Sequence, residues 1–242
     1  LLLTYVREGK GLAIAVDKNG AFYVTGAVSV SSTSFGWPSD IWIGKYDPNG
    51  LLVWTTTYNG SASRADQGRG IAVDGGGNIY VAGFETGITS ERFLEEFPWL
   101  RKYDPQGLVV WTVVGTDPKM GAANAIALDA QGNLYLTSGS TAQARSMWVQ
   151  KYAQGGVSQW SVSYEPPDTP YGSGEALGKG IATDLAGNVC VVTTERFLSR
   201  GDDYDIGVRK YSQSAFTDTG QEQIPVSIYL PGVGTVIVTV SC

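Results

Sequence analysis

The hydrophobic pattern of this chain consists of short runs rich in β-branched and aromatic residues, separated by turn-forming residues. No segment keeps a 3.6-residue apolar period over the length of a helix. Many of the runs flank four-residue turns that begin with Asp and end with Gly, as in residues 47–50, Asp-Pro-Asn-Gly. Asp first and Gly fourth favour a type I turn, and Pro suits the second position. The pattern therefore predicts β-hairpins and an all-β fold.

The hairpins recur as an internal repeat made of two halves. In the first half an aspartate separates two apolar runs, and these aspartates are 57, 55 and 55 residues apart: Asp17, Asp74, Asp129 and Asp184. The second half carries Lys, Gly and Trp at fixed offsets in residues 45–54, 102–111 and 151–160, and Lys210 begins a fourth copy. Four short strands per repeat predict a propeller blade, because a single blade cannot bury both of its faces without neighbours.

These residues resemble the SBBP family of β-propeller repeats, which is related in pattern to the NHL and YVTN propellers. The resemblance rests on G-x-G-I-A-V-D-x-x-G-N-I-Y-V-A-G, best seen at residues 68–83, and on the K-Y-D-P-x-G-x-x-x-W half. It covers most of residues 9–216. It implies a propeller in an extracellular or cell-surface protein, and it implies no shared catalytic residue.

We expect a β-propeller of four repeat blades, each of four antiparallel strands, in residues 1–216. Residues 1–6 align with the outer strand at residues 109–114, whereas the fourth repeat lacks that strand after Tyr211. The N-terminal strand is therefore expected to complete the last blade and close the ring. The alternative is a part of a larger ring, which would leave an open hydrophobic blade face at each end.

Residues 217–242 belong to no repeat and form a predicted C-terminal β-strand tail. Residues 235–240 alternate threonine and valine around an isoleucine without any charge, and such an exposed edge is a template for strand pairing. The tail could add a strand to its own first or last blade, open a following domain, or insert into a neighbouring copy. The residues expected to carry the insertion are Ile224, Val226, Ile228, Val236, Ile237, Val238 and Val240.

Insertion into other copies predicts a non-catalytic structural propeller that self-assembles into a filament or surface array, because a head-to-tail contact that does not close gives a fibre. A propeller that binds a glycan or a surface protein is the first alternative. A carboxylate-dependent lyase or glycosidase is the second.

Composition narrows the possible chemistry. The 242 residues include 17 Lys and Arg, 23 Asp and Glu, and no histidine, for a net charge of −6. The missing histidine excludes Ser-His-Asp and Cys-His nucleophile pairs and His-ligated zinc. With no dense basic run and no apolar run of membrane-helix length, neither nucleic-acid binding nor membrane insertion is expected. We expect no cofactor, and Cys190 and Cys242 leave one disulfide or two free thiols open.

The tight turns are expected at one end of each blade and the long, irregular connections at the other. The long connections are residues 29–39, 84–99, 116–121, 138–146, 165–177 and 195–205. Variable loops on rigid strands usually carry the function of such scaffolds, so the long-loop end is the candidate site. Its exposed-aromatic candidates for ligand binding are Phe35, Trp37, Phe97 and Trp99.

Loop carboxylates are the remaining catalytic candidates, since two carboxylates can perform glycosidase chemistry without histidine. They are Glu91, Glu95, Glu96, Glu175, Glu195, Asp202, Asp203 and Asp205. Surface acidity is the simpler interpretation because nothing fixes their spacing. The repeated turn aspartates are expected to cap turns rather than bind calcium, and the repeated Tyr and Trp to fill the core. The tetrapeptide Glu-Arg-Phe-Leu occurs at both 91–94 and 195–198, which we interpret as retained repeat sequence.

Overall fold

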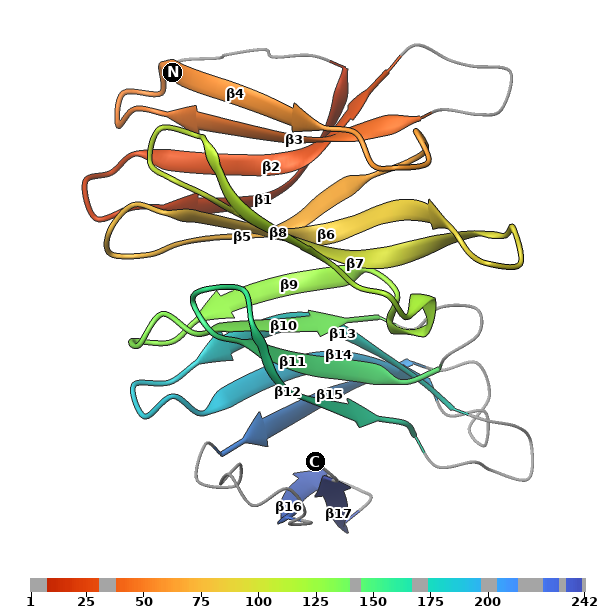
Figure 1. Cartoon of the computed structure of the whole chain (residues 1–242). Helices are drawn as coiled ribbons and strands as arrows, with labels where there is room; N and C mark the ends of the chain where they lie inside the picture. The colour runs from red at the N-terminus through yellow and green to blue at the C-terminus, as the bar shows by residue number, and fades with distance from the viewer. Residues whose placement is uncertain are drawn as a thin grey trace. The chain divides into compact units, whose positions relative to one another are not determined.

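The computed structural model describes residues 8–30, 38–139, 145–166, 174–196 and 204–212, together with the backbone of residues 224–230 and 234–240. These residues form β-strands and one short 3-10 helix, η1 (Pro118–Met120) (Figure 1). Within this part of the chain, no helix is long and apolar enough to cross a membrane. The chain divides into two compact units, residues 1–126 and 127–242. The predicted all-β fold is confirmed.

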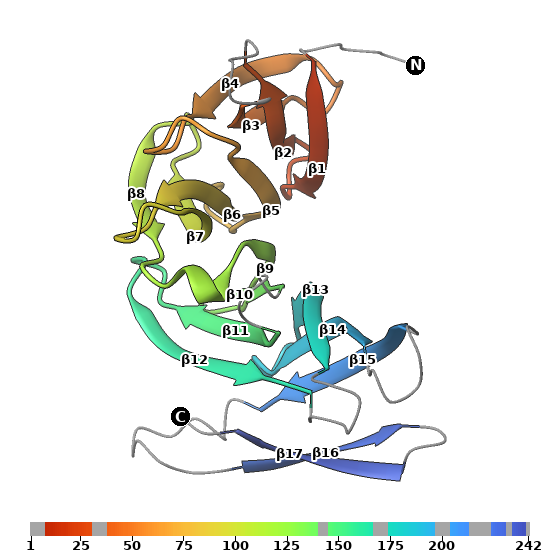
Figure 2. The same cartoon turned by 90° about the vertical axis from the view of Figure 1, so that its right-hand side faces the viewer.

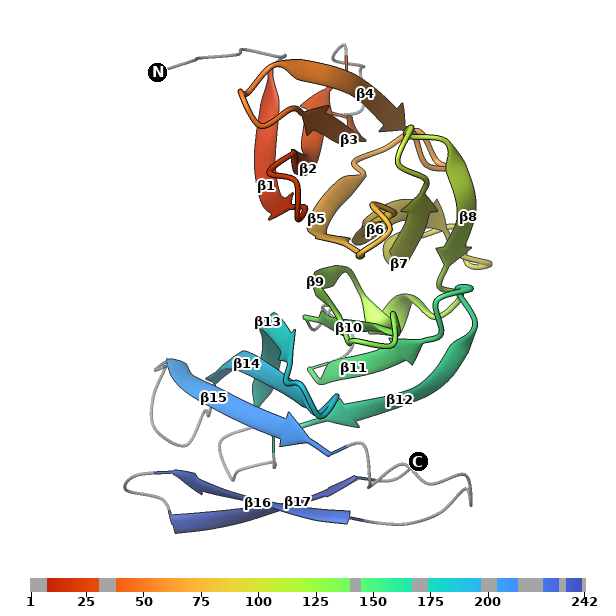
Figure 3. The same cartoon turned by 90° about the vertical axis from the view of Figure 1, so that its left-hand side faces the viewer.

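Each repeat forms one antiparallel sheet whose strands follow chain order (Figures 2 and 3). The first sheet contains β1 (Gly9–Val16), β2 (Phe22–Ser29), β3 (Ser39–Tyr46) and β4 (Leu52–Tyr58). The second contains β5 (Gln67–Val73), β6 (Ile79–Ile88), β7 (Leu94–Tyr103) and β8 (Val109–Val114). The third contains β9 (Ala123–Leu128), β10 (Leu134–Ser138), β11 (Met147–Tyr152) and β12 (Ser158–Tyr164).

The fourth sheet has three strands in the described residues: β13 (Glu175–Thr183), β14 (Val189–Arg196) and β15 (Tyr204–Tyr211). Residues 1–6, which were expected to supply its outer strand, lie outside the described residues. The tail forms a separate two-stranded sheet of β16 (Ile224–Leu230) and β17 (Gly234–Val240). The tail strands therefore pair with each other rather than standing as one unpaired strand.

The Asp-Gly turns share one construction. Seven turn glycines have φ between 80° and 86°, a left-handed conformation that glycine adopts without steric cost. In the turn before β6, the Asp74 carboxylate accepts hydrogen bonds from the backbone of Gly76 and Asn78 and from the Tyr80 hydroxyl. Although burial opposes the change, the hydrogen bonds from Asn78 and Tyr80 lower the pKa of Asp74. Turn capping by these aspartates is confirmed.

The cores lie between successive sheets within each unit. In residues 1–126, Tyr23, Ile41 and Ile43 of the first sheet pack against Ile71 and Trp99 of the second. In residues 127–242, the equivalent positions of the third sheet pack against the fourth: the cluster is Tyr135, Met147, Val149, Val162, Ala176, Val189, Val191 and Tyr211. The repeated tyrosines therefore fill the core, as predicted.

Candidate functional site

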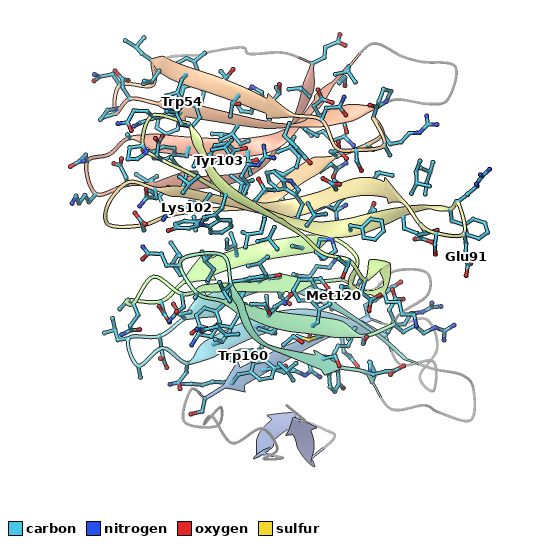
Figure 4. All side chains as sticks on the ribbon, viewed as in Figure 1. Trp54, Glu91, Lys102, Tyr103, Met120 and Trp160 are labelled. Carbon is cyan, nitrogen blue, oxygen red and sulfur yellow. The ribbon has the colours of Figure 1, made fainter. Side chains whose placement is uncertain are left out.

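The β6–β7 hairpin presents exposed apolar side chains at the long-loop end of the first unit. Its strands are each ten residues long, and Ile88 pairs with Leu94 next to the turn. The prediction of an irregular loop over residues 84–99 is therefore wrong, because paired strands occupy most of this range and only residues 89–93 separate β6 from β7. Figure 4 shows Glu91 at this tip and Lys102 toward the opposite end of the same sheet.

Three exposed apolar side chains flank the polar turn at the tip. Ile88 is 63% exposed, Phe93 61% and Leu94 50%. The backbone N–H of Thr89 donates to Phe93 O, and the N–H of Arg92 donates to Thr89 O, which is the hydrogen-bond pattern of the Asp-Gly turns. Arg92 occupies the glycine position of that turn with φ of 66°. A side chain in this conformation is strained, and such strain often persists at functional sites.

Buried carboxylates fasten the base of this hairpin. Asp66 Oδ1 accepts from the backbone N–H of Thr86 at 2.8 Å, and Oδ2 accepts from that of Gly60 at 2.5 Å. The Thr86 hydroxyl donates to Ala65 O. Burial raises the pKa of Asp66 to about 6, although the two backbone N–H groups oppose the rise. Asp66 thus ties the segment after β4 to the end of β6.

A second buried carboxylate, Glu85, accepts from the Tyr58 hydroxyl at 2.5 Å. Tyr58 stacks on Trp99, and the Arg101 guanidinium lies 4.0 Å from the centroid of the Tyr58 ring. Burial and the hydrogen bond to Glu85 raise the pKa of Tyr58 to about 12. Tyr58, Glu85 and Arg101 come from β4, β6 and β7, so they join the first sheet to the second beneath the hairpin.

The second unit contains the same three residue types at the same repeat positions. Tyr164, Glu195 and Arg209 come from β12, β14 and β15, and Arg209 lies 3.4 Å from the centroid of the Tyr164 ring. Here Arg209 forms a buried ion pair with Glu195. Gly207 stands where the second sheet has Trp99, and a Cβ there would collide with the Glu195 carboxylate. The missing indole therefore makes room for the ion pair.

Sequence reasoning missed these clusters, although the repeat contains a signal. Glu85 and Glu195 stand at the same offset from the turn aspartate, and Arg101 and Arg209 each precede the repeat lysine. A Tyr follows the repeat Trp by the same interval at Tyr58 and Tyr164. Aligning the repeats beyond their most similar residues would have brought each Tyr, Glu and Arg together.

The four aromatic residues predicted to bind a ligand differ in their burial, and two of them lie outside the described residues. Trp99 is fully buried in the core, so its prediction as an exposed aromatic is wrong. Its indole is needed to fill the space between the first two sheets. Phe97 is half-buried and lies over Gly87, where a Cβ would approach its ring to 2.7 Å. Phe35 and Trp37 lie outside the described residues, and ligand binding by the predicted aromatics remains a prediction.

The predicted catalytic carboxylates are not brought together as a facing pair among the described residues. Glu95 and Glu96 are neighbours on β7, so they point to opposite faces of the sheet. Glu195 is engaged by Arg209, while Glu91 and Asp205 are exposed and Glu175 is half-buried at the start of β13. Asp202 and Asp203 lie outside the described residues. Likewise, no group of three His, Cys, Asp or Glu in the described chain is arranged to hold a metal ion.

A comparison with known protein families finds a match within the repeat. Residues 53–83 match the SBBP family, described as a beta-propeller repeat. The chain carries an SBBP-type β-propeller repeat. This confirms the resemblance, and the match spans β4 through the middle of β6. No curated protein matches the chain.

Two solved structures are similar at low identity. An endo-arabinase from Bacteroides thetaiotaomicron aligns with a TM-score of 0.47 and 12% identity, over 98% of this chain and 94% of that chain. A protein of unknown function from Dyadobacter fermentans aligns with a TM-score of 0.44 and 11% identity, over 83% of this chain and 75% of that chain. Neither likeness identifies a substrate for this SBBP-repeat chain.

The predicted self-assembling structural propeller is contradicted. The comparisons give no indication of self-assembly. The local structure also differs from the expectation, because residues 224–230 pair with residues 234–240 along the whole of both strands. One edge of each tail strand is therefore satisfied within the chain.

Proposed function

We propose that this chain is a binding propeller module that holds a protein partner at the tip of the β6–β7 hairpin. The observation that carries the proposal is the exposure of Ile88, Phe93 and Leu94 around the strained Arg92. Exposed apolar patches often mark protein interaction sites, and phenylalanine and arginine are enriched in protein interfaces. An extracellular or cell-surface location, which the SBBP resemblance implies, is part of this proposal.

The base of the hairpin supports this function physically. Asp66 and Glu85 are buried and hydrogen-bonded directly below the tip, so the tip stands on a rigid support. A preorganised tip binds with less loss of conformational entropy than a free loop. A glycan partner is less favoured here, because the Trp99 indole is buried and two of the three exposed apolar side chains, Ile88 and Leu94, are aliphatic and carry no ring to stack on a sugar.

The test uses a phage-displayed random peptide library selected on the full chain. We expect selected peptides to bind the Phe93→Ser, Leu94→Ser double variant at least roughly thirtyfold more weakly, because truncating interface hot spots costs about 2 kcal/mol or more. Leu108→Ser is the matched control, since Leu108 is 67% exposed in the β7–β8 turn region of the same unit. Equal binding to wild type and the double variant would refute the proposal, as would a chain that binds a glycan array but no peptide.

A further inference from the structure

The fourth sheet carries an apolar face on β14 and β15, which we call the β15 face. It consists of Val192, Tyr204, Ile206 and Val208. Val192 pairs with Val208 across the strands, and residues 204, 206 and 208 alternate along β15, so all four share one side of the sheet. Ile206 is 77% exposed and Val208 56%.

The same repeat positions are buried in the preceding sheets. Ile206 and Val208 lie four and two residues before the repeat lysine. In the first sheet these positions are Ile41 and Ile43, both 0% exposed under the second sheet. In the third sheet they are Met147 and Val149, also 0% exposed under the fourth sheet. The β15 face is therefore the kind of surface that each of these interfaces covers with another β-structure.

The tail hairpin of the same unit has a matching apolar face. The register of β16 and β17 pairs residue 224 with 240, 226 with 238, and 228 with 236. Cross-strand partners lie on the same side of a sheet, so Ile224, Val226, Ile228, Val236, Val238 and Val240 share one face. The other face holds Ser227, Thr235 and Thr239 beside Pro225, Tyr229 and Ile237. One face of the hairpin is therefore formed by aliphatic residues, whereas the other mixes hydroxyl-bearing and apolar residues.

We propose that the apolar face of the β16–β17 hairpin packs on the β15 face and takes the place of a following blade. β16 follows β15 along the chain and lies near it in space (Figures 2 and 3). Residues 212–223 connect the two strands, and a connection of this length spans up to roughly 40 Å. The connection is therefore long enough for the hairpin to turn back onto the sheet, and tethering favours this contact over one with a separate molecule.

This contact stabilises the hairpin and also covers the β15 face. An isolated two-stranded hairpin is only marginally stable in water, so β16 and β17 need a surface against their apolar side. The β15 face likewise needs a covering layer, because each repeat of such a protein is stabilised by contact with its neighbours. The hairpin supplies that cap with valine and isoleucine, the residue types that cover Ile41, Met147 and Val149 inside the units.

The experiment measures thiol access to the β15 face in the full chain. Cys190→Ser and Cys242→Ser remove the native thiols, and Val208→Cys then supplies the only one. Leu185→Cys in the same background is the reference, since Leu185 is fully exposed. Iodoacetamide labelling is followed by mass spectrometry and normalised to the rate in denaturant. We expect Val208→Cys to react at least roughly tenfold more slowly than the reference, the factor given by an opening free energy of about 1.4 kcal/mol.

Two hairpin variants then identify what covers the face. Val226→Asp with Val238→Asp, on the apolar face, is expected to abolish the protection of Val208→Cys. Ser227→Asp with Thr239→Asp, on the opposite face, is the matched control and is expected to preserve it. The proposal is overturned if Val208→Cys reacts as fast as the reference with the native hairpin. It is also overturned if protection survives the apolar-face variant, or if it increases with protein concentration, which would indicate a second copy on this face.

Discussion

Arg92 and the seven turn glycines hold the same backbone conformation at different cost. A left-handed conformation costs an L-residue about 1–2 kcal/mol, whereas glycine adopts it freely but loses more entropy on folding. We expect Arg92→Gly to raise the free energy of unfolding by about 0.5–1 kcal/mol, measured by urea denaturation. Gly20→Ala, at the same turn position, is the converse control and should lower it. A loss of stability in Arg92→Gly would contradict the strain assigned to the tip.

Asp66 predicts a specific dependence of stability on pH. Its pKa rises from 3.8 to about 6 on folding, so the folded state binds the proton more tightly than the unfolded state. The stability that this group contributes is fully present below pH 3.8 and is lost as pH rises through 6, by an amount on the order of 3 kcal/mol. Relative to Asp66→Asn, wild type should therefore weaken between pH 4 and pH 7.

Urea unfolding of both proteins at several pH values checks this expectation. The carboxylates of Asp74, Asp129 and Asp184 have lowered pKa values and act in the opposite direction, at more acidic pH, in both proteins. The difference between wild type and variant isolates Asp66. If the stability of wild type and of Asp66→Asn changed in parallel with pH, the pKa of Asp66 would be the same in the folded and unfolded chain, which would contradict the prediction.

At the scale of strands and hairpins, the Glu-Arg pair that begins a repeated tetrapeptide has two different structures. Glu-Arg-Phe-Leu at 91–94 runs from an exposed turn into β7, whereas Glu195 and Arg196 of the second copy end β14. Glu91 is exposed, but Glu195 is buried against Arg209. The interpretation of this tetrapeptide as retained repeat sequence is therefore wrong, because the two copies occupy different repeat positions. Position in the repeat, rather than local sequence, decides the environment of each glutamate.

The Tyr-Glu-Arg clusters make the two units differ in how a buried glutamate is held. Arg209→Met should destabilise by about 3–5 kcal/mol, because it leaves Glu195 as an uncompensated buried charge, and the Glu195→Gln, Arg209→Met double variant should cost less. Glu85→Gln is the comparison, with an expected cost of about 1–3 kcal/mol, since Glu85 accepts from a neutral tyrosine. A double-mutant cycle by chemical denaturation measures the coupling. Purely additive effects of Glu195→Gln and Arg209→Met would argue against the ion pair.

Across the whole chain, the features that depend on local chemistry could be predicted from the sequence. Turn type follows from Asp and Gly spacing, and the repeat itself indicated antiparallel blades with tyrosines in the core. The β6–β7 hairpin was missed because Glu85 and Thr86 resemble loop residues. Their burial depends on Tyr58 and Asp66, which lie at least 20 residues away in the chain. The hairpin that carries the exposed tip therefore depends on contacts between residues that are distant in the sequence, and a local sequence pattern does not reveal such contacts.

The recurrence of one interface chemistry has a genetic consequence. Ile41 and Ile43 meet the second sheet just as Met147 and Val149 meet the fourth, so any sheet built from this repeat presents the same two complementary sides. A tandem duplication or deletion of one whole repeat would leave compatible neighbours in contact, whereas a recombination event falling within a repeat would place two like sides together. Recombination between copies can therefore change the number of blades in a single event without inventing a new contact surface.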